Sequence, residues 1–212
     1  AYVDIAAGAT ITTTEDGAVA ATLGGTGNAY IYNDGAIDSG SRGLFAYSFG
    51  GNAYVGNTGD IYVDGADSAA GFAVGIVVNG IDSSVVSSGA IDVLGSAGDA
   101  VSIGIYGYAI DATNVTATGD IDVDAVAGTA AGIQTYSFGD GTVSAGNITV
   151  SNVGGSASGV NVTSGGIATV SVAGDMEVYS AVGSADGVVV YGLDSASVTV
   201  TGNIDVDGAT AS

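Results

Sequence analysis

The sequence contains no cysteine, histidine, proline or tryptophan, and its only basic residue is Arg42. Without cysteine and histidine, the chain cannot build thiol or imidazole metal sites or the nucleophilic triads that use these residues. One arginine provides no basic surface for nucleic acid or for an anionic membrane, and the formal net charge of −21 repels both. We therefore expect no nucleic-acid partner and no enzyme of these classes.

Long apolar runs and helical patterns are also missing. Although 47% of the residues are hydrophobic, no uninterrupted apolar run approaches the roughly 18 residues of a membrane-spanning helix. No segment shows the 3.6-residue apolar spacing of an amphipathic helix. The 38 glycines suit a chain that turns often. The absence of proline leaves every backbone amide available to a β-ladder. These features predict an all-β protein with no membrane span.

The most informative feature that is present is a repeated phrase of six residues beginning with glycine. It reads GDIYVD at Gly59, GAIDVL at Gly89, GDIDVD at Gly119, GNITVS at Gly146, GDMEVY at Gly174 and GNIDVD at Gly202, at intervals of 27 to 30 residues. GAIDSG at Gly35 and GATITT at Gly8 extend the series upstream. So steady a period indicates that one structural unit is stacked repeatedly.

Each repeat has room for three strands. The phrase alternates apolar and polar residues, which is typical of a strand with one buried face. A second strand follows it, as in GFAVGIV from Gly71, and a third ends the unit, as at residues 114–118 and 169–173. Three strands of about six residues and their turns fill the period and leave no room for a helix. The sequence predicts a single domain over residues 1–212, a parallel β-helix (β-solenoid) of about seven coils of roughly 28 residues with three strands per coil.

Two positions of the phrase are aliphatic in nearly every copy, and we expect them to face inward. Because successive coils lie about 4.8 Å apart, equivalent residues stack directly on one another. The second position holds Ile37, Ile61, Ile91, Ile121, Ile148, Met176 and Ile204, and the fourth holds Val63, Val93, Val123, Val150, Val178 and Val206. These two columns are the predicted core.

The outward positions of the phrase carry half of the 22 acidic residues, which predicts an acidic stripe along one face. Stacked carboxylates suit calcium, and the candidate ligands are Asp92, Asp120, Asp122 and Asp124. The alternative is a solvated face, because acids at the first and fifth positions never fall on adjacent coils and so avoid repulsion. We favour the solvated face and expect no cofactor, with calcium as the alternative.

Smaller signals lie in the third strand. Tyr30 and Tyr54 occupy equivalent outward positions, and Tyr32 joins them in an exposed aromatic ladder. Such a ladder stacks on sugar rings or on a neighbouring protein, or it simply strengthens the sheet. Asn33 and Asn57 end the same strands facing inward, where stacked side-chain amides bond along the ladder.

Both ends of the chain fall in mid-coil without a capping unit. Residues 1–7 read as a third strand, and the last repeat ends after its first strand. Open β-edges of this kind favour head-to-tail association of the protein with itself. The predicted edges are Ala1, Tyr2, Val3, Asp4 and Ile5 at one end and Asn203, Ile204, Asp205, Val206 and Asp207 at the other.

The repeat GDIDVDAVAGTAAGIQTYSFGDGTVSA from Gly119, and GNITVSNVGGSASGVNVTSGGIATVSVA after it, resemble the passenger repeats of bacterial autotransporters. The resemblance runs from about Gly8 to Asp207. It implies a β-helical fold, an extracellular or cell-surface location and an adhesive or structural role, and it supplies no catalytic residues. The chain has no lysine, so it offers trypsin-like proteases a single cleavage site, and without cysteine it does not depend on redox conditions. Both features agree with an extracellular location.

The sequence therefore predicts a non-enzymatic extracellular solenoid, either a passenger segment or a fibre subunit. Its expected partners are other copies of itself and a surface glycan or protein. Two alternatives remain. A glycan hydrolase would use paired carboxylates, for which the run Asp120, Asp122 and Asp124 is the best candidate. An ice-binding solenoid would use a regular Thr-x-Thr array along its stacked strands, and in the predicted third strands this array occurs only at Thr116/Thr118 and Thr199/Thr201, with Ser144 and Ser171 between.

Overall fold

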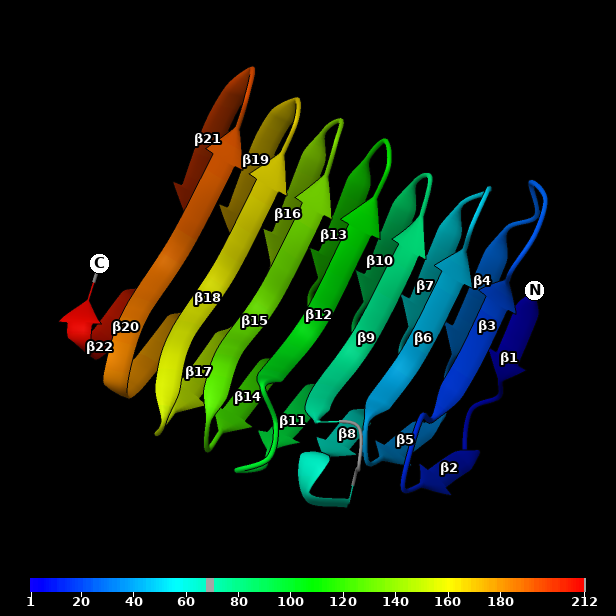
Figure 1. The fold of residues 1–212 in the computed structure, drawn as a ribbon, viewed down its shortest axis with the longest axis horizontal. Coiled ribbons are helices and arrows are strands. Elements are labelled where there is room, and N and C mark those ends of the chain that lie inside the picture. Colours follow the sequence, from blue (N-terminus) through cyan, green and yellow to red (C-terminus); the bar gives the residue numbers. More distant parts are fainter. Residues whose placement is uncertain (68–70, 212) are drawn as a thin grey trace.

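The computed structural model describes the backbone of residues 1–67 and 71–211, and the side chains of these residues except 67, 210 and 211. The chain forms a parallel β-solenoid of about seven coils spaced about 28 residues apart, as predicted (Figure 1). In the described ranges the one helical element is a short 3-10 turn, η1 (Gly65–Asp67). None of the described segments forms a helix long and apolar enough to cross a membrane.

Each coil contributes three strands, and equivalent strands stack in three parallel ladders. The first-strand ladder contains β2 (Thr10–Thr13), β5 (Ala36–Ser39), β8 (Ile61–Asp64), β11 (Ile91–Gly95), β14 (Ile121–Ala125), β17 (Ile148–Asn152), the beginning of β20 (Met176–Gly192) and β22 (Ile204–Ala211). The second-strand ladder contains β3 (Ala18–Thr22), β6 (Arg42–Ser48), β9 (Phe72–Gly80), β12 (Val101–Ala109), β15 (Gly128–Ser137), β18 (Gly155–Ser164) and the end of β20. The third-strand ladder contains β1 (Tyr2–Ile5), β4 (Ala29–Asn33), β7 (Ala53–Asn57), β10 (Ser83–Ser87), β13 (Thr113–Ala117), β16 (Gly141–Ala145), β19 (Ile167–Val172) and β21 (Ser195–Val200).

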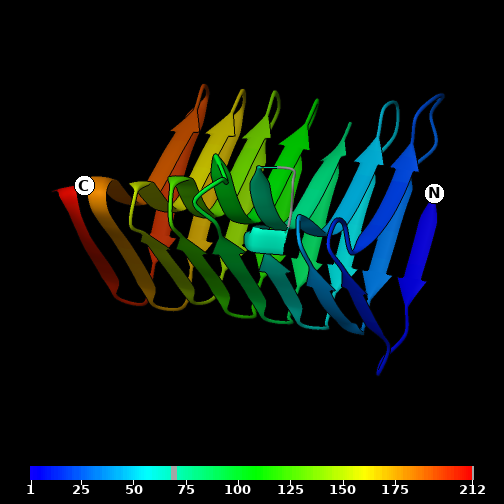
Figure 2. The same cartoon turned by 60° about the horizontal axis from the view of Figure 1, so that its bottom comes forward.

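The first and second ladders are joined through β20. This strand pairs with β17 at its beginning and with β18 along its later part, so the two ladders form one 14-stranded sheet while the third ladder forms an 8-stranded sheet. Figure 2, which brings the first-strand ladder forward, shows the corner between the two joined ladders. The second strands β6 to β18 have 7 to 10 residues, longer than predicted, because they extend toward this corner.

The core is the pair of aliphatic columns predicted for the first strand, together with equivalent columns of the other two. Ile61, Ile91 and Ile121 stack in register, and each is at most 2% exposed. Val93 and Val123 form the neighbouring column and are fully buried. Burying each such side chain contributes about 1.5 to 3 kcal/mol before conformational entropy is counted. The inward assignment is confirmed from Ile37 to Met176, whereas Ile204 in the last coil is 44% exposed.

A glycine column in the second strand packs against the isoleucine column of the first. A Cβ on Gly104 would lie 2.4 Å from Cγ2 of Ile121 and 2.6 Å from the carbonyl oxygen of Gly132. Gly75 and Gly132 meet Ile91 and Ile148 at the same 2.4 Å. Since real Cβ atoms do not approach other atoms so closely, these positions have no space for any side chain. The column therefore sets how closely the two strands approach across the corner.

Buried side-chain amides connect the third strands along the axis. Asn33 Nδ2 donates a 2.7 Å hydrogen bond to Asn57 Oδ1, and Asn57 Nδ2 donates a 3.0 Å bond to Ser87 Oγ. Both asparagines are at most 2% exposed. The predicted inward amide ladder is confirmed, and it extends one coil further through Ser87.

Candidate binding surfaces

The acidic stripe lies on the outer face of the first-strand ladder, in the predicted register. Asp92 pairs with Asp122, and Glu177 pairs with Asp205, so these acids are vertical neighbours. At the fifth position, acids alternate with other residues along the column Asp64, Leu94, Asp124, Ser151, Tyr179 and Asp207. This alternation limits like-charge contact between adjacent strands.

Acids at the first position of the phrase also have a structural role. Asp60 Oδ1 accepts a hydrogen bond of 3.1 Å from the backbone N–H of Ala90, one coil further on. Asp175 Oδ1 accepts a 2.8 Å bond from the N–H of Asn203 in the same way. Asp120 Oδ1 instead accepts a 2.9 Å bond from Asn147 Nδ2. These carboxylates link successive coils at the start of the first strand.

Partial burial and neighbouring carboxylates shift the pKa values of two acids at the centre of the stripe, Asp92 and Asp122. Partial burial, and secondly the charge of Asp124, raise the pKa of Asp92 above the ordinary value of 3.8. Partial burial raises the pKa of Asp122 as well, with further contributions from Asp124 and Asp92. Asp92 and Asp122 are therefore mildly destabilising at neutral pH, since each is charged in an environment that disfavours the charge.

The four candidate calcium ligands line three different hollows. Asp120 and Asp122 face a groove of about 320 Å³ that Asp175 and Glu177 also line. Asp124 faces a more apolar groove, and Asp92 faces a third one with Asp38 and Asp60. Among the side chains that the structure describes, no group of three or more acidic residues is placed to hold a metal ion. The calcium site and the paired-carboxylate hydrolase site stay predictions.

The predicted aromatic ladder of the third strand forms a contact cluster. Tyr32 and Tyr54 have ring centroids 5.3 Å apart, and Tyr30 lies 6.4 Å from Tyr54. Tyr2 extends the cluster, with its ring 5.6 Å from that of Tyr32. Burial, and secondly Tyr32, raise the pKa of the Tyr54 phenol. The cluster is thus partly buried by its own packing, with Tyr32 39% exposed.

A second aromatic column, absent from the sequence-based predictions, lies on the outer face of the second-strand ladder. The strand register places in one column Tyr47, Asn79, Tyr108, Tyr136, Thr163 and Tyr191. The rings of Tyr108 and Tyr136 stack with centroids 5.7 Å apart and planes 7° from parallel. Phe138 meets both of these rings edge-on. The tyrosines of this column lie one or two repeat lengths apart in the sequence, a spacing that indicates a stacked column without fixing its register to a single residue.

A hollow of about 410 Å³ opens in this column where Asn79 replaces a tyrosine. Tyr47 and Tyr108 line it from the coils on either side. Phe49 and Ile110, 67% and 55% exposed, line it from the adjoining turns. The hollow combines aromatic walls with two polar residues, Asn79 and Ser48, and the Ser48 hydroxyl already donates a hydrogen bond to the carbonyl oxygen of Gly27. Aromatic walls with few polar groups are the usual composition of a small-ligand site.

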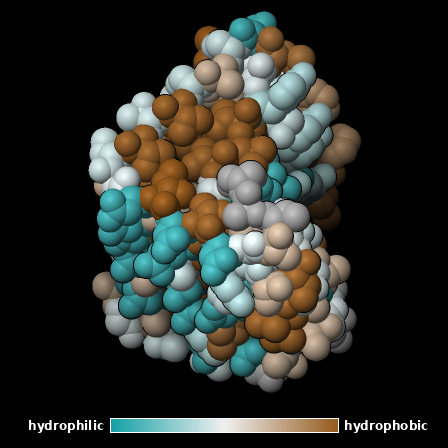
Figure 3. Space-filling model, turned by 90° about the vertical axis from the view of Figure 1, so that its left-hand side faces the viewer, coloured by the Kyte–Doolittle hydropathy of each residue, from teal (hydrophilic) through white to brown (hydrophobic). Residues whose placement is uncertain are grey.

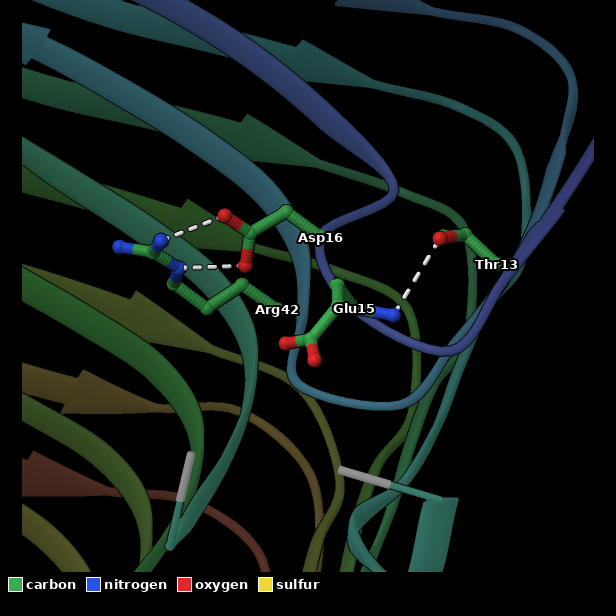
Figure 4. A network of polar contacts seen from close by, with 4 residues as sticks. All are labelled: Thr13, Glu15, Asp16 and Arg42. Atoms are coloured by element: carbon green, nitrogen blue, oxygen red, sulfur yellow. Dashed lines mark hydrogen bonds and ion pairs between the residues drawn. The ribbon is translucent and has the colours of Figure 1, made fainter. Parts of the chain in front are cut away.

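The single basic side chain is held by an acidic partner. Arg42 Nε donates a 2.7 Å hydrogen bond to Asp16 Oδ1, and its Nη2 pairs with Asp16 Oδ2 (Figure 4). The guanidinium carbon also lies 4.0 Å from the ring centre of Phe45. Beside this pair, the backbone N–H of Glu15 donates to Thr13 Oγ1. Arg42 is therefore engaged in the fold rather than directed at an anionic ligand.

The last coil presents an apolar surface. Figure 3, which views the solenoid from the C-terminal side, shows a continuous hydrophobic area there. Exposed apolar residues of this coil include Val189, Tyr191, Leu193, Val198 and Ile204. The predicted edge strands β1 and β22 each have one partner among the described strands, β4 and β20 respectively.

Comparisons of the chain with protein-family models, with curated proteins and with solved structures gave no match.

Proposed function

We propose that this protein is an extracellular structural or adhesive β-solenoid, as the resemblance of its repeats to autotransporter passenger repeats implies. The stacked aliphatic core makes a rod whose side faces, one acidic and two bearing aromatic clusters, are free for contact with other molecules. Trypsin-like proteases have a single target in the chain, Arg42, whose backbone lies in β6 and whose side chain is paired with Asp16. This resistance to proteolysis supports an extracellular location. The absence of cysteine makes the fold independent of redox conditions.

Head-to-tail association through the end coils is part of this proposal. The observation that carries it is the uniform parallel register of the three ladders, which a coil of a second copy can continue. Val198 and Ile204 are 49% and 44% exposed, whereas Val170 and Met176, one coil earlier in the same columns, are at most 1% exposed. A further coil of the same cross-section would bury both columns and pair the open strand edges.

Sedimentation velocity and electron microscopy test the association. We expect the protein to form filaments one solenoid wide with a repeat of roughly 34 Å, which is seven coils of about 4.8 Å. Ile204→Asp places a charge in the stacked surface and should abolish them. Val86→Asp, at an exposed outward position in the middle of the solenoid, is the control and should leave them intact. A protein that stays monomeric at ~1 mM, far above the Kd of a specific contact, would refute the association.

The location is tested separately by antibody labelling of intact cells of the source organism. Labelling without permeabilisation is the expected result. Labelling that appears only after permeabilisation would refute the extracellular location, whatever the outcome of the association experiment.

A further inference from the structure

The hollow at Asn79 interrupts a column of aromatic rings. Tyr47 and Tyr108 stand one coil before and one coil after Asn79 in the same outward column of the second-strand ladder. The asparagine side chain is shorter than a tyrosine, so the ring that would continue the column is replaced by open space of about 410 Å³. We call this space the Asn79 slot.

The dimensions of the Asn79 slot match a single six-membered ring. Two steps of the ladder separate Tyr47 from Tyr108 by roughly 9.6 Å. One ring placed midway would make two contacts of about 4.8 Å, within the range at which rings stack. One step further along the column, Tyr108 and Tyr136 stack nearly parallel with centroids 5.7 Å apart. The column is therefore already arranged for stacking along the solenoid axis.

The polar group in the slot restricts the chemistry of the ring. The Asn79 amide carries two N–H donors and a carbonyl acceptor, and it forms no hydrogen bond with the other described residues. A purely apolar ligand would bury this amide unpaired, which is costly. A sugar ring in the pyranose form has apolar faces for the tyrosines and edge hydroxyls for the amide.

The charges of the protein further restrict the class of ligand that the slot can bind. The net charge of −21 repels phosphorylated and acidic sugars. Arg42, the one residue that would hold an anionic group, is already paired with Asp16. A quaternary ammonium ion would be attracted by the charge and by the rings, but it has no hydrogen-bonding group for Asn79. The chemistry of the slot therefore favours a neutral sugar.

We propose that the Asn79 slot binds a neutral pyranose ring, stacked between Tyr47 and Tyr108 with its hydroxyls on the Asn79 amide. The column repeats this pattern once, with Thr163 between Tyr136 and Tyr191. The two positions are three coils, or roughly 14 Å, apart. A neutral glycan chain that reaches both binds more tightly than a monosaccharide. This inference rests on the adhesive role proposed above and names its ligand class.

Calorimetric titration tests the proposal with neutral oligosaccharides of known linkage. The probes are the hexasaccharides of β-1,4-glucose, α-1,4-glucose, β-1,4-xylose and β-1,4-N-acetylglucosamine, their monosaccharides, and tetramethylammonium chloride as a cationic probe without a hydrogen-bonding group. Asn79→Tyr fills the slot with the ring that the column lacks, so it should preserve the thermal stability. At least one hexasaccharide should bind the wild-type protein, and Asn79→Tyr should weaken that binding by at least about tenfold.

Two further variants distinguish a specific loss of glycan binding at the slot from a general loss of folded structure. Tyr108→Leu keeps an apolar side chain but removes one wall, and it should weaken binding to a similar extent. Tyr179→Leu makes the same change at an exposed tyrosine of the first-strand ladder, outside both aromatic clusters, and should leave binding unchanged. Sedimentation of the same variants should show unaltered association, because each substituted residue is paired with a strand on both sides.

Several results would overturn the proposal. The first is the absence of binding of any neutral hexasaccharide at ~10 mM, well above the Kd of a weak complex. The second is binding that Asn79→Tyr leaves intact, and the third is a preference for tetramethylammonium. Each of them concerns the slot alone. Association and surface labelling report on the proposed function independently, so failure of one is distinguishable from failure of the other.

Discussion

Gly104 of the second strand lies directly against Ile121 of the first strand in the next coil, with room between them for no additional atom. A Cβ at position 104 would be 2.4 Å from Ile121 Cγ2. Because the same contact recurs at Gly43, Gly75 and Gly132, the spacing across this corner is repeated along the solenoid. The contact explains why a chain so rich in glycine is nevertheless tightly packed.

Gly104→Ala should destabilise the protein by about 1 to 3 kcal/mol, the usual cost of overpacking a core. Gly24→Ala is the matched control, since a Cβ there meets no atom within 4 Å. Chemical denaturation of the two variants measures the difference. Equal midpoints would contradict the packing described for the glycine column.

Val123→Asp should be far more damaging than Asp122→Asn, although the two positions are adjacent. Val123 is fully buried in a stacked aliphatic column, so an aspartate there costs several kcal/mol. Asp122 faces outward among other acids, and its neutral isostere should be slightly stabilising at pH 7. Thermal unfolding compares them, and similar melting temperatures would be incompatible with the inward and outward assignments.

Stability should fall as the pH rises through the interval just above 3.8, the ordinary carboxyl pKa from which Asp92 and Asp122 are raised. The folded state holds these protons more tightly than the unfolded state, so their contribution is present at lower pH and is lost above the folded pKa. Asp122→Asn should reduce this dependence. Asp38→Asn, at the equivalent strand position opposite Tyr62, is the control and should retain it. Denaturation midpoints measured from pH 3 to about pH 7 show the effect, and a slope that Asp122→Asn leaves unchanged would refute it.

Asn57→Ala should cost about 1 to 3 kcal/mol for each buried partner that it leaves unpaired. It removes the acceptor of the Asn33 amide and the donor to Ser87. Asn52→Ala is the comparison: this exposed residue accepts a bond of 3.4 Å from the N–H of Asp82, and its loss should cost less than about 1 kcal/mol. Urea denaturation gives both values. A smaller loss for Asn57 than for Asn52 would argue against the buried amide ladder.

Calcium should raise the melting temperature no more than sodium chloride of equal ionic strength does. Both salts merely screen the repulsion along the acidic stripe if it is a solvated face. Differential scanning calorimetry with increasing calcium chloride is the measurement. A saturable shift specific to calcium and abolished by Asp122→Asn would instead establish a metal site.

The sequence by itself determined the length of the repeating coil and which side chains of the first strand face inward. Ile91, Ile121 and Val123 could be placed in the core because alternation within the phrase has a period of two and the phrase recurs at nearly constant intervals. Asn33 and Asn57 could be placed in one inward ladder for the same reason. In these cases the alternation within one strand fixes the face of each side chain, and the repeat interval stacks that strand on its equivalents.

The tertiary structure alone decided what lies across a corner and what lies on the second strand. The contact of Gly104 with Ile121 joins two different ladders, and the path of the chain between them, rather than any local pattern, sets it. The alignment of Tyr47, Asn79 and Tyr108 depends on turns of unequal length, which the repeat spacing does not fix to a single residue. A shift of one residue turns a side chain to the opposite face, so only the observed register brings these three residues together around one slot.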